Sequence, residues 1–221
     1  TMGRKHVTSL NQNKLIFNSE PRAIFKSIDH VYVVDGITVY EVDKFFNKKA
    51  IGSVALTGNV WFAFLPVGNK VYCMMTDEKN IYVITEDGSS VTMATVTDTN
   101  APTNPQYVAA FGNRFVVSEK GTPNYYLSTV NLSGTVADYF TINSVALFNR
   151  ASGIIGQFAV LHGQLYIMCN YVTDIWMNIP TQITVASVTT EFPWKLNTSY
   201  NWDYGIADPF SLSVDFGRIT W

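Results

Sequence analysis

The chain has 221 residues, of which 47% are hydrophobic and only 14% are charged, well below the roughly 25% charged residues of an average soluble domain. Fifteen Lys and Arg residues against seventeen Asp and Glu residues leave a net charge of −2, which argues against a strongly basic nucleic-acid-binding protein. The composition also excludes a disordered chain, because such chains combine low hydrophobicity with high net charge.

Short apolar runs rich in Val, Ile, Tyr, Phe and Thr are separated by turns that contain Gly, Asn or Asp-Gly, and no helix of three turns is predicted. The first hairpin is expected over residues 31–42, with Asp35-Gly36 in a type I′ turn. Further strands are expected at residues 71–75, 81–85, 114–118, 125–130 and 165–169. The predicted fold class is all-β.

One pattern recurs along the chain: an apolar strand, a tight turn, and a second apolar strand. Its turn falls at Asp29, Gly68, Gly112, Gly163 and Gly217, which gives spacings of 39, 44, 51 and 54 residues. Such spacings are typical of propeller blades, and one unit cannot cover both of its own faces, so units must stack around an axis. The repeat predicts a β-propeller of four-stranded (or three-stranded) blades, with a β-sandwich as the alternative.

The repeat also predicts the domain organisation. We expect an N-terminal arm with a tag remnant at residues 1–12 and a β-propeller portion at 13–221. The expected blade units lie near 22–58, 59–104, 105–153, 154–208 and, in part, 209–221. The last unit stops within its second strand, which would leave an open sheet edge. The sequence is therefore expected to be an incomplete fragment of a longer protein.

No catalytic motif is found. The chain lacks a nucleophile elbow, a phosphate-binding loop, a zincin helix and a dinucleotide fingerprint. The expected innermost strands, near residues 59–65, 106–111 and 157–161, contain no Asp or Glu, which disfavours the acid and base chemistry of a glycosidase. Asp98, Asn100 and Asn104 are interpreted as an ordinary polar loop instead of a calcium site. We expect no enzyme activity, no cofactor and no metal.

Cys73 and Cys169 lie far apart inside apolar runs. Buried free thiols are favoured over a disulfide between them.

A long connection over residues 189–204 is the best candidate for a partner surface, because long ordered loops often carry contacts. The residues proposed for this surface are Phe192, Pro193, Trp194, Lys195, Tyr200 and Trp202. Simple anchoring of the loop by its aromatic residues is the alternative. A sugar-binding platform could be formed by aromatic residues, namely Trp61, Trp176, Trp194, Tyr125, Tyr126, Tyr200 and Tyr204. Packing in the core is the favoured interpretation of these residues.

Several short motifs occur in a characteristic order in the second half of the chain. They are Gly112-Asn113-Arg114-Phe115, Gly121-Thr122, Tyr126-Leu127-Ser128, Ser152-Gly153-Ile154-Ile155-Gly156, Gly163-Gln164-Leu165-Tyr166, Thr173-Asp174-Ile175-Trp176, Phe192-Pro193-Trp194, Trp202-Asp203-Tyr204-Gly205 and Gly217-Arg218-Ile219. In this order and spacing the sequence resembles the packaged-DNA stabilisation proteins, or tail hub proteins (tail accessory factors), of short-tailed bacteriophages. The resemblance covers roughly residues 105–221 and, more loosely, 22–95. Family members carry a Gly-Cys pair near the final repeat, where this chain has Tyr204-Gly205-Ile206.

The resemblance implies a structural virion protein of the phage tail that is assembled in the host bacterial cytoplasm. Its partners would be the portal protein, other tail proteins and further copies of itself, in a ring of six. It would close the channel below the portal, retain the packaged DNA without sequence-specific binding, and connect to distal tail parts during ejection. No membrane partner is expected, because no apolar run is long enough to span a bilayer. The alternative is a carbohydrate- or receptor-binding β-propeller module of a phage tail.

Overall fold

A computed structural model describes residues 21–130, 132, 137–147, 153–185, 188–199, 202–215 and 218–220. The chain divides into two compact units, Thr1–Leu56 and Thr57–Trp221. Apart from one short 3-10 helix, the regular elements of the described residues are β-strands. The all-β prediction is therefore confirmed.

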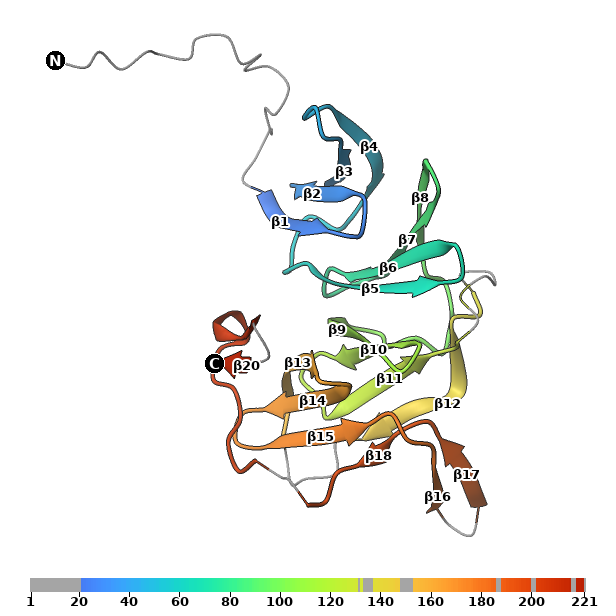
Figure 1. The fold of residues 1–221 in the computed structure, drawn as a ribbon, viewed down its shortest axis with the longest axis vertical. Coiled ribbons are helices and arrows are strands. Elements are labelled where there is room, and N and C mark those ends of the chain that lie inside the picture. Colours follow the sequence, from blue (N-terminus) through green and yellow to red (C-terminus); the bar gives the residue numbers. More distant parts are fainter. Residues whose placement is uncertain are drawn as a thin grey trace, which may run out of the picture. The chain divides into compact units, whose positions relative to one another are not determined.

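The first unit holds one antiparallel four-stranded sheet whose strands are hydrogen-bonded in chain order (Figure 1). The strands are β1 (Pro21–Lys26), β2 (Val31–Asp35), β3 (Thr38–Val42) and β4 (Lys48–Ser53). Arg22 fastens β1 to the rest of the sheet, since its Nη1 donates to the carbonyls of Gly36 at 2.9 Å and Ala55 at 2.5 Å. The edge strand β1 is thereby held by side-chain as well as backbone hydrogen bonds.

The β2–β3 turn differs from the prediction. Asp35 ends β2 and pairs with Thr38, so Gly36 and Ile37 occupy the turn. A positive φ is found at Gly36 (58°) but not at Ile37. This is the pattern of a type II′ turn, not the type I′ turn expected at Asp35-Gly36, and the reason is that a β-branched residue such as Ile resists positive φ.

The second unit contains three further four-stranded antiparallel sheets and two hairpins. The second sheet consists of β5 (Trp61–Val67), β6 (Lys70–Thr76), β7 (Ile81–Asp87) and β8 (Ser90–Thr95), and the third of β9 (Pro105–Phe111), β10 (Arg114–Glu119), β11 (Asn124–Ser128) and β12 (Phe140–Leu147). The fourth sheet consists of β13 (Ile155–Leu161), β14 (Gln164–Cys169), β15 (Thr173–Met177) and β18 (Lys195–Leu196). The hairpins are β16 (Thr181–Val185) with β17 (Val188–Phe192), and β19 (Ser213–Asp215) with β20 (Arg218–Thr220), the latter preceded by the 3-10 helix η1 (Pro209–Ser211).

The recurrent turn of the sequence joins the first and second strand of each sheet. Gly112 and Asn113 both have positive φ (58° and 60°), as do His162 and Gly163 (49° and 70°), so both turns are of type I′. Glycine thus stands first in one turn and second in the other. Aligning the repeats on glycine, as the sequence suggested, is off by one residue at Gly163. Position 217 lies outside the described residues.

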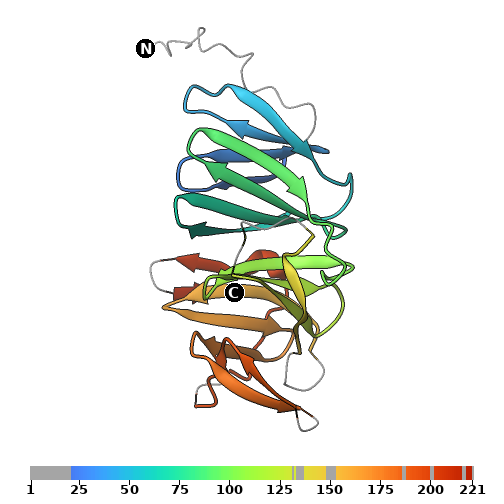
Figure 2. The same ribbon diagram turned by 90° about the vertical axis from the view of Figure 1, so that its right-hand side faces the viewer.

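Apolar residues on both faces explain why the strands read as continuous hydrophobic runs. On β10, Phe115 and Val117 pack against the second sheet, whereas Val116 between them packs against the fourth. On β14, Ile167 faces the third sheet, and Met168 faces the opposite side, where it lies in one cluster with the partly buried Ile219 of β20. Successive side chains of a strand point to opposite faces, so each of these sheets is covered on both sides, as the stacked sheets of Figure 2 show.

Polar contacts join the second and third sheets at one end. The Thr76 hydroxyl donates to the carbonyl of Gln106, and the Lys120 ammonium is paired with the Glu78 carboxylate. Glu78 also accepts hydrogen bonds from the backbone and side-chain nitrogens of Asn59, at 3.3 and 3.2 Å. Burial acts to raise the pKa of Glu78, but the bonds from Lys120 and Asn59 outweigh it, so its pKa lies below the ordinary value.

Both cysteines are buried free thiols, so this prediction is confirmed. Burial, reinforced by the negative charge of Glu86, raises the pKa of the Cys73 thiol well above its ordinary value. The Cys169 thiol donates to the carbonyl of Val172 at 3.1 Å.

The thiols should therefore be unreactive in the folded protein. At pH 8 we expect a disulfide exchange reagent such as DTNB to label neither Cys73 nor Cys169 within the time in which a free thiol reacts completely, because the thiolate is the reactive form and both sulfurs are buried. In denaturant both should react at once. Rapid labelling of the native protein would contradict the buried environment.

The Glu78–Lys120 pair should stabilise the second unit in a pH-dependent way. A carboxyl whose pKa is lowered by folding contributes stability above its unfolded pKa and loses that contribution as the pH falls through the folded value. We expect Glu78→Gln to lower the free energy of unfolding by about 1 kcal/mol at pH 7, since Lys120 is half-exposed and screened by solvent. The difference from the wild type should shrink as the pH falls below the ordinary pKa of Glu.

Denaturant titrations at several pH values measure this effect. Asp87→Asn is the matched control, because it removes the more exposed ion pair between Lys70 and Asp87 and should change little. A Glu78→Gln effect that is the same at pH 3 and pH 7 would show that the carboxylate charge is not responsible.

Candidate functional site

The segment proposed as a partner surface follows the β16–β17 hairpin and runs back along the fourth sheet. Its Lys195 and Leu196 form β18, which pairs with Met177 and Trp176 of β15. Lys195 therefore belongs to a strand of the fourth sheet instead of a free loop.

Trp194 is fully buried, with 0% exposure. Its indole lies in the core between the third and fourth sheets, where it meets the ring of Phe111 edge-on at 5.0 Å and the ring of Phe192 at 6.1 Å. Gly112 leaves room for it, since a Cβ at this position would lie 2.7 Å from the indole nitrogen. The prediction that Trp194 belongs to a partner surface is wrong, because its large apolar side chain is more stable in the core.

The other proposed residues differ in exposure. Phe192 and Pro193 are half-buried, and the Phe192 ring lies 5.6 Å from that of Trp176. Trp202 is half-buried over Tyr166, with 5.2 Å between the ring centroids. Lys195 is exposed, and Tyr200 lies outside the described residues. Phe192, Trp194 and Trp202 anchor this connection, which was the alternative interpretation of the sequence.

Residues 202–206 form a second stretch that is fastened to the fourth sheet. The backbone nitrogen of Thr173 donates to the carbonyl of Trp202 at 3.0 Å, and the Thr173 hydroxyl donates to that of Tyr204 at 2.7 Å. The backbone nitrogen of Ile206 donates to the carbonyl of Cys169 at 2.8 Å. A Cβ on Gly205 would lie 1.8 Å from that same carbonyl oxygen, so only glycine allows this approach.

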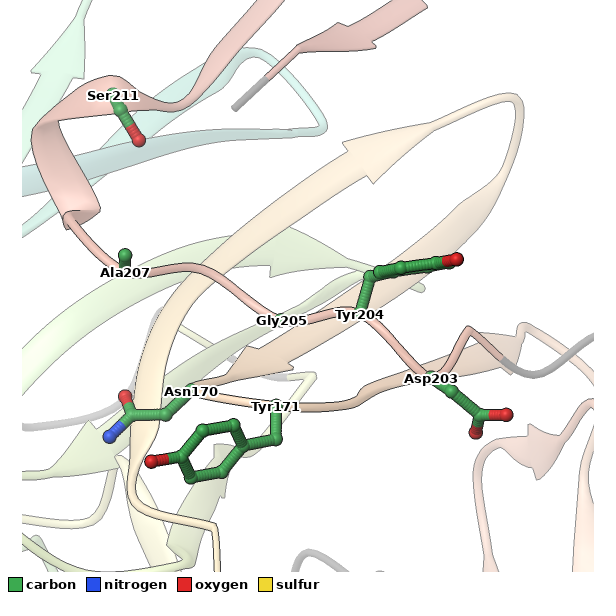
Figure 3. Close-up of a pocket in the computed structure, with 7 residues that line it drawn as sticks. All are labelled: Asn170, Tyr171, Asp203, Tyr204, Gly205, Ala207 and Ser211. Carbon is green, nitrogen blue, oxygen red and sulfur yellow. The ribbon is translucent and has the colours of Figure 1, made fainter.

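This stretch borders a shallow pocket of about 400 Å³. Its lining is Asn170, Tyr171, Asp203, Tyr204, Gly205, Ala207 and Ser211 (Figure 3). The two tyrosine side chains are 78% and 73% exposed, and in Figure 3 they point away from each other. They therefore do not form the facing pair that would enclose a ring-shaped ligand.

The sequence analysis named Tyr204 among possible sugar-stacking residues but missed Tyr171. The exposure of Tyr171 could have been predicted from its position, because Asn170-Tyr171 directly follows a strand and lies in the turn between β14 and β15. An aromatic side chain in such a turn has little core to pack into. Tyr204 could not be placed from sequence, because its position depends on the close approach at Gly205.

Metal sites in proteins group His, Cys, Asp and Glu side chains around the ion. Among the described residues no three such side chains are grouped so that they could hold a metal ion. Asp98 uses its two carboxylate oxygens on backbone nitrogens, those of Asn100 at 2.8 Å and Phe140 at 2.6 Å, and His30 pairs with Glu41 at 2.8 Å. No helix in the described ranges is long and apolar enough to cross a membrane.

No protein-family model matches the sequence, and no curated protein matches it either. Solved structures do match. A virginiamycin B lyase from Staphylococcus aureus superposes with a TM-score of 0.50 and 11% identity, over 79% of this chain and 56% of that chain. The WD40 domain of Neurospora crassa Pan2 gives a TM-score of 0.45 and 8% identity, over 70% and 48%. The β-propeller domain of Myceliophteria thermophila Cps50 (Swd1) gives 0.42 and 8%, over 85% and 73%.

These likenesses concern the fold alone. The chain spans about half the length of the first two structures. The succession of four-stranded antiparallel sheets, together with the match to the virginiamycin B lyase at a TM-score of 0.50, identifies the fold as a β-propeller. The propeller prediction is confirmed, and the β-sandwich alternative is wrong.

Trp194 and its neighbour Lys195 provide a direct test of anchoring against surface function. We expect Trp194→Ala to lower the free energy of unfolding by about 3–5 kcal/mol, because it leaves a large cavity between two sheets. Lys195→Ala should change it by less than about 0.5 kcal/mol, since that side chain is exposed. Denaturant unfolding followed by tryptophan fluorescence and circular dichroism measures both. Equal stability of Trp194→Ala and wild type would contradict the buried position.

Proposed function

We propose that this β-propeller belongs to a non-enzymatic structural protein of a phage tail. In this proposal the protein forms a hub below the portal, closes the DNA channel, retains packaged DNA and connects to distal tail parts during ejection. Its partners are the portal, other tail proteins and further copies of the same protein, in a ring of six. It is assembled in the bacterial cytoplasm and resides in the virion.

The observation that carries the structural role is the chemistry of the first strands of the three four-stranded sheets in the second unit. β9 contacts both β5 and β13, so these strands lie nearest the axis around which the sheets stack (Figure 1). Their sequences, WFAFLPV, PQYVAAF and IGQFAVL, contain no Asp, Glu, His, Lys or Arg. Acid and base catalysis most often uses a carboxylate, an imidazole or an amine in reach of a substrate, and these three strands supply none of those groups. A scaffold role fits them better than a reaction.

The residues behind the resemblance to tail hub proteins support a shared architecture. Gly112 makes room for the Trp194 indole, and a Cβ on Gly156 would lie 2.8 Å from a side-chain carbon of Ile206. Trp176 is buried with Trp194 between the third and fourth sheets, and Gly205 permits the close approach at Cys169. The close contacts at Gly112, Gly156 and Gly205 leave no room for a side chain, and the two tryptophans fill the core. A sequence that retains them in order is a good candidate for the same blade structure.

The charge balance supports a protein beside which DNA can move. With a net charge of −2 and 14% charged residues, the chain lacks the cationic excess that holds phosphate groups. Few charges and many aromatic residues also suit a protein whose surface is largely covered in an assembly.

A retention assay tests the proposal. Purified full-length protein is added to DNA-filled particles that lack it, and genome release is followed with an intercalating dye. We expect release to slow to the rate of complete particles. The folded variant Lys195→Ala should act like wild type, whereas Gly205→Ala, which disrupts the fourth sheet, should not. Continued leakage with correctly folded wild type bound to the particles would overturn the hub proposal.

A carbohydrate- or receptor-binding module is the second candidate, favoured by the exposed Tyr171 and Tyr204 beside the pocket. A glycan array with wild type, Tyr171→Ser and Tyr204→Ser tests it. Binding that both substitutions abolish would favour this candidate, and an empty array would exclude it for the glycans present.

A further inference from the structure

The loop from Asp43 to Asn47, which joins β3 to β4, is held together by its own hydrogen bonds. One carboxylate oxygen of Asp43 accepts from the backbone nitrogens of Phe45 and Asn47, each at 2.8 Å, and the other accepts from the Asn47 amide at 2.7 Å. The backbone nitrogens of Phe46 and Asp43 donate to the carbonyls of Asp43 and Asn47, at 2.9 and 3.0 Å. The loop is therefore ordered by local bonds and does not need a neighbour to hold its shape.

This ordered loop displays two large apolar side chains. Phe45 is 65% exposed and Phe46 is 56% exposed. Phe46 has a φ of 63°, a left-handed conformation that costs free energy for a bulky side chain and that Gly or Asn adopts more easily. A strained residue that the surrounding bonds hold in place points to a function of its side chain.

Three lysines lie in or directly after this loop. Lys44 places its Nζ 5.2 Å from the centroid of the Phe45 ring, and Lys48 places its Nζ 4.8 Å from that of Tyr40. Lys49 follows on β4 with an exposed side chain. The acidic residue of the loop, Asp43, directs its carboxylate at the loop's own nitrogens. The tip therefore presents two apolar rings with Lys44 beside the ring of Phe45, and Lys48 and Lys49 follow at the start of β4, where Lys49 is paired with Glu41 of β3.

We propose that the Phe45-Phe46 tip is a membrane-contact site that inserts its two rings into the surface of an anionic lipid bilayer, with Lys44, Lys48 and Lys49 near the headgroup phosphates. Apolar side chains combined with lysines are what binds proteins peripherally to such a surface. A protein partner would be expected to form about one hydrogen bond per 100–200 Å² of interface. The Asp43 carboxylate and several backbone groups of the loop are already hydrogen-bonded within the loop, which favours a lipid surface over a protein partner. The site goes beyond the proposed hub function and does not depend on it.

This inference departs from the expectation of no membrane partner. That expectation rested on the lack of a spanning segment, whereas a peripheral contact needs only the tip of a loop.

Vesicle flotation tests the site with the whole chain. Vesicles of phosphatidylcholine with 30% phosphatidylserine should carry the protein upward, and pure phosphatidylcholine should carry much less. Each Lys→Gln substitution at positions 44, 48 and 49 should weaken partitioning about fivefold, the effect of one basic residue near an anionic surface. Phe45→Ser and Phe46→Gly should each weaken it tenfold or more, because a buried ring is lost.

Phe46→Gly separates lipid binding from folding. Glycine accepts the φ of 63° without strain, so the melting temperature of this variant should equal or exceed that of wild type while its binding falls. A purely structural Phe46 would instead give a lower melting temperature. Tyr171→Ser, which removes an aromatic side chain of 78% exposure outside the loop, is the matched control and should bind like wild type.

Three results would overturn the proposal. One is no flotation of wild type with anionic vesicles, which would leave a protein socket or a second copy of the chain as the occupant of the tip. Another is unchanged flotation of Phe45→Ser and Phe46→Gly. The third is equal flotation with neutral and anionic vesicles, since the lysines would then contribute nothing.

Discussion

The second unit depends on one constraint: its central strands are apolar on both faces, so each sheet needs a neighbour on either side. Phe115 and Val117 on one face of β10, and Val116 on the other, cannot all be buried by a single partner sheet. The same holds for β14, where Ile167 and Met168 belong to different clusters. Stacking sheets around an axis meets this demand at every sheet, and the repeat in the sequence is its direct expression.

This constraint explains what the sequence could predict. Strand positions, the all-β class and the propeller fold follow from short apolar runs and turn residues, which are local signals. The type and exact position of each turn were harder to predict from the sequence. The first turn lies at Gly36-Ile37, one residue later than predicted, and only Gly36 has a positive φ. In the turn at His162-Gly163 both residues have a positive φ, so glycine can stand at either position of such a turn. Such one-residue shifts change neither the strands nor their faces, so the fold prediction tolerated them.

The proposed surface was harder to predict, because a long connection rich in aromatic residues has the same sequence signature whether it is displayed or buried. Trp194 is buried since Gly112, 82 positions earlier in the chain, leaves space for its indole. Likewise, Tyr204 is displayed because Gly205 lies against Cys169. Both outcomes depend on contacts between segments that are distant in sequence, and a single sequence gives no information about such pairs.

The left-handed residues that are not glycine show where the fold explains the residue at a position and where it does not. Among the described residues these are Phe46, Glu78, Asn113 and His162. Asn113 and His162 belong to type I′ hairpin turns that require positive φ, and Glu78 is held by Lys120 and Asn59 between two sheets. Phe46 is held by bonds within its own loop alone, and Gly or Asn would adopt its conformation at lower cost. The three-residue turn accounts for the positive φ of Phe46, but its ring is exposed, so burial does not account for a phenylalanine at this position, and the membrane contact proposed for the tip would use that ring.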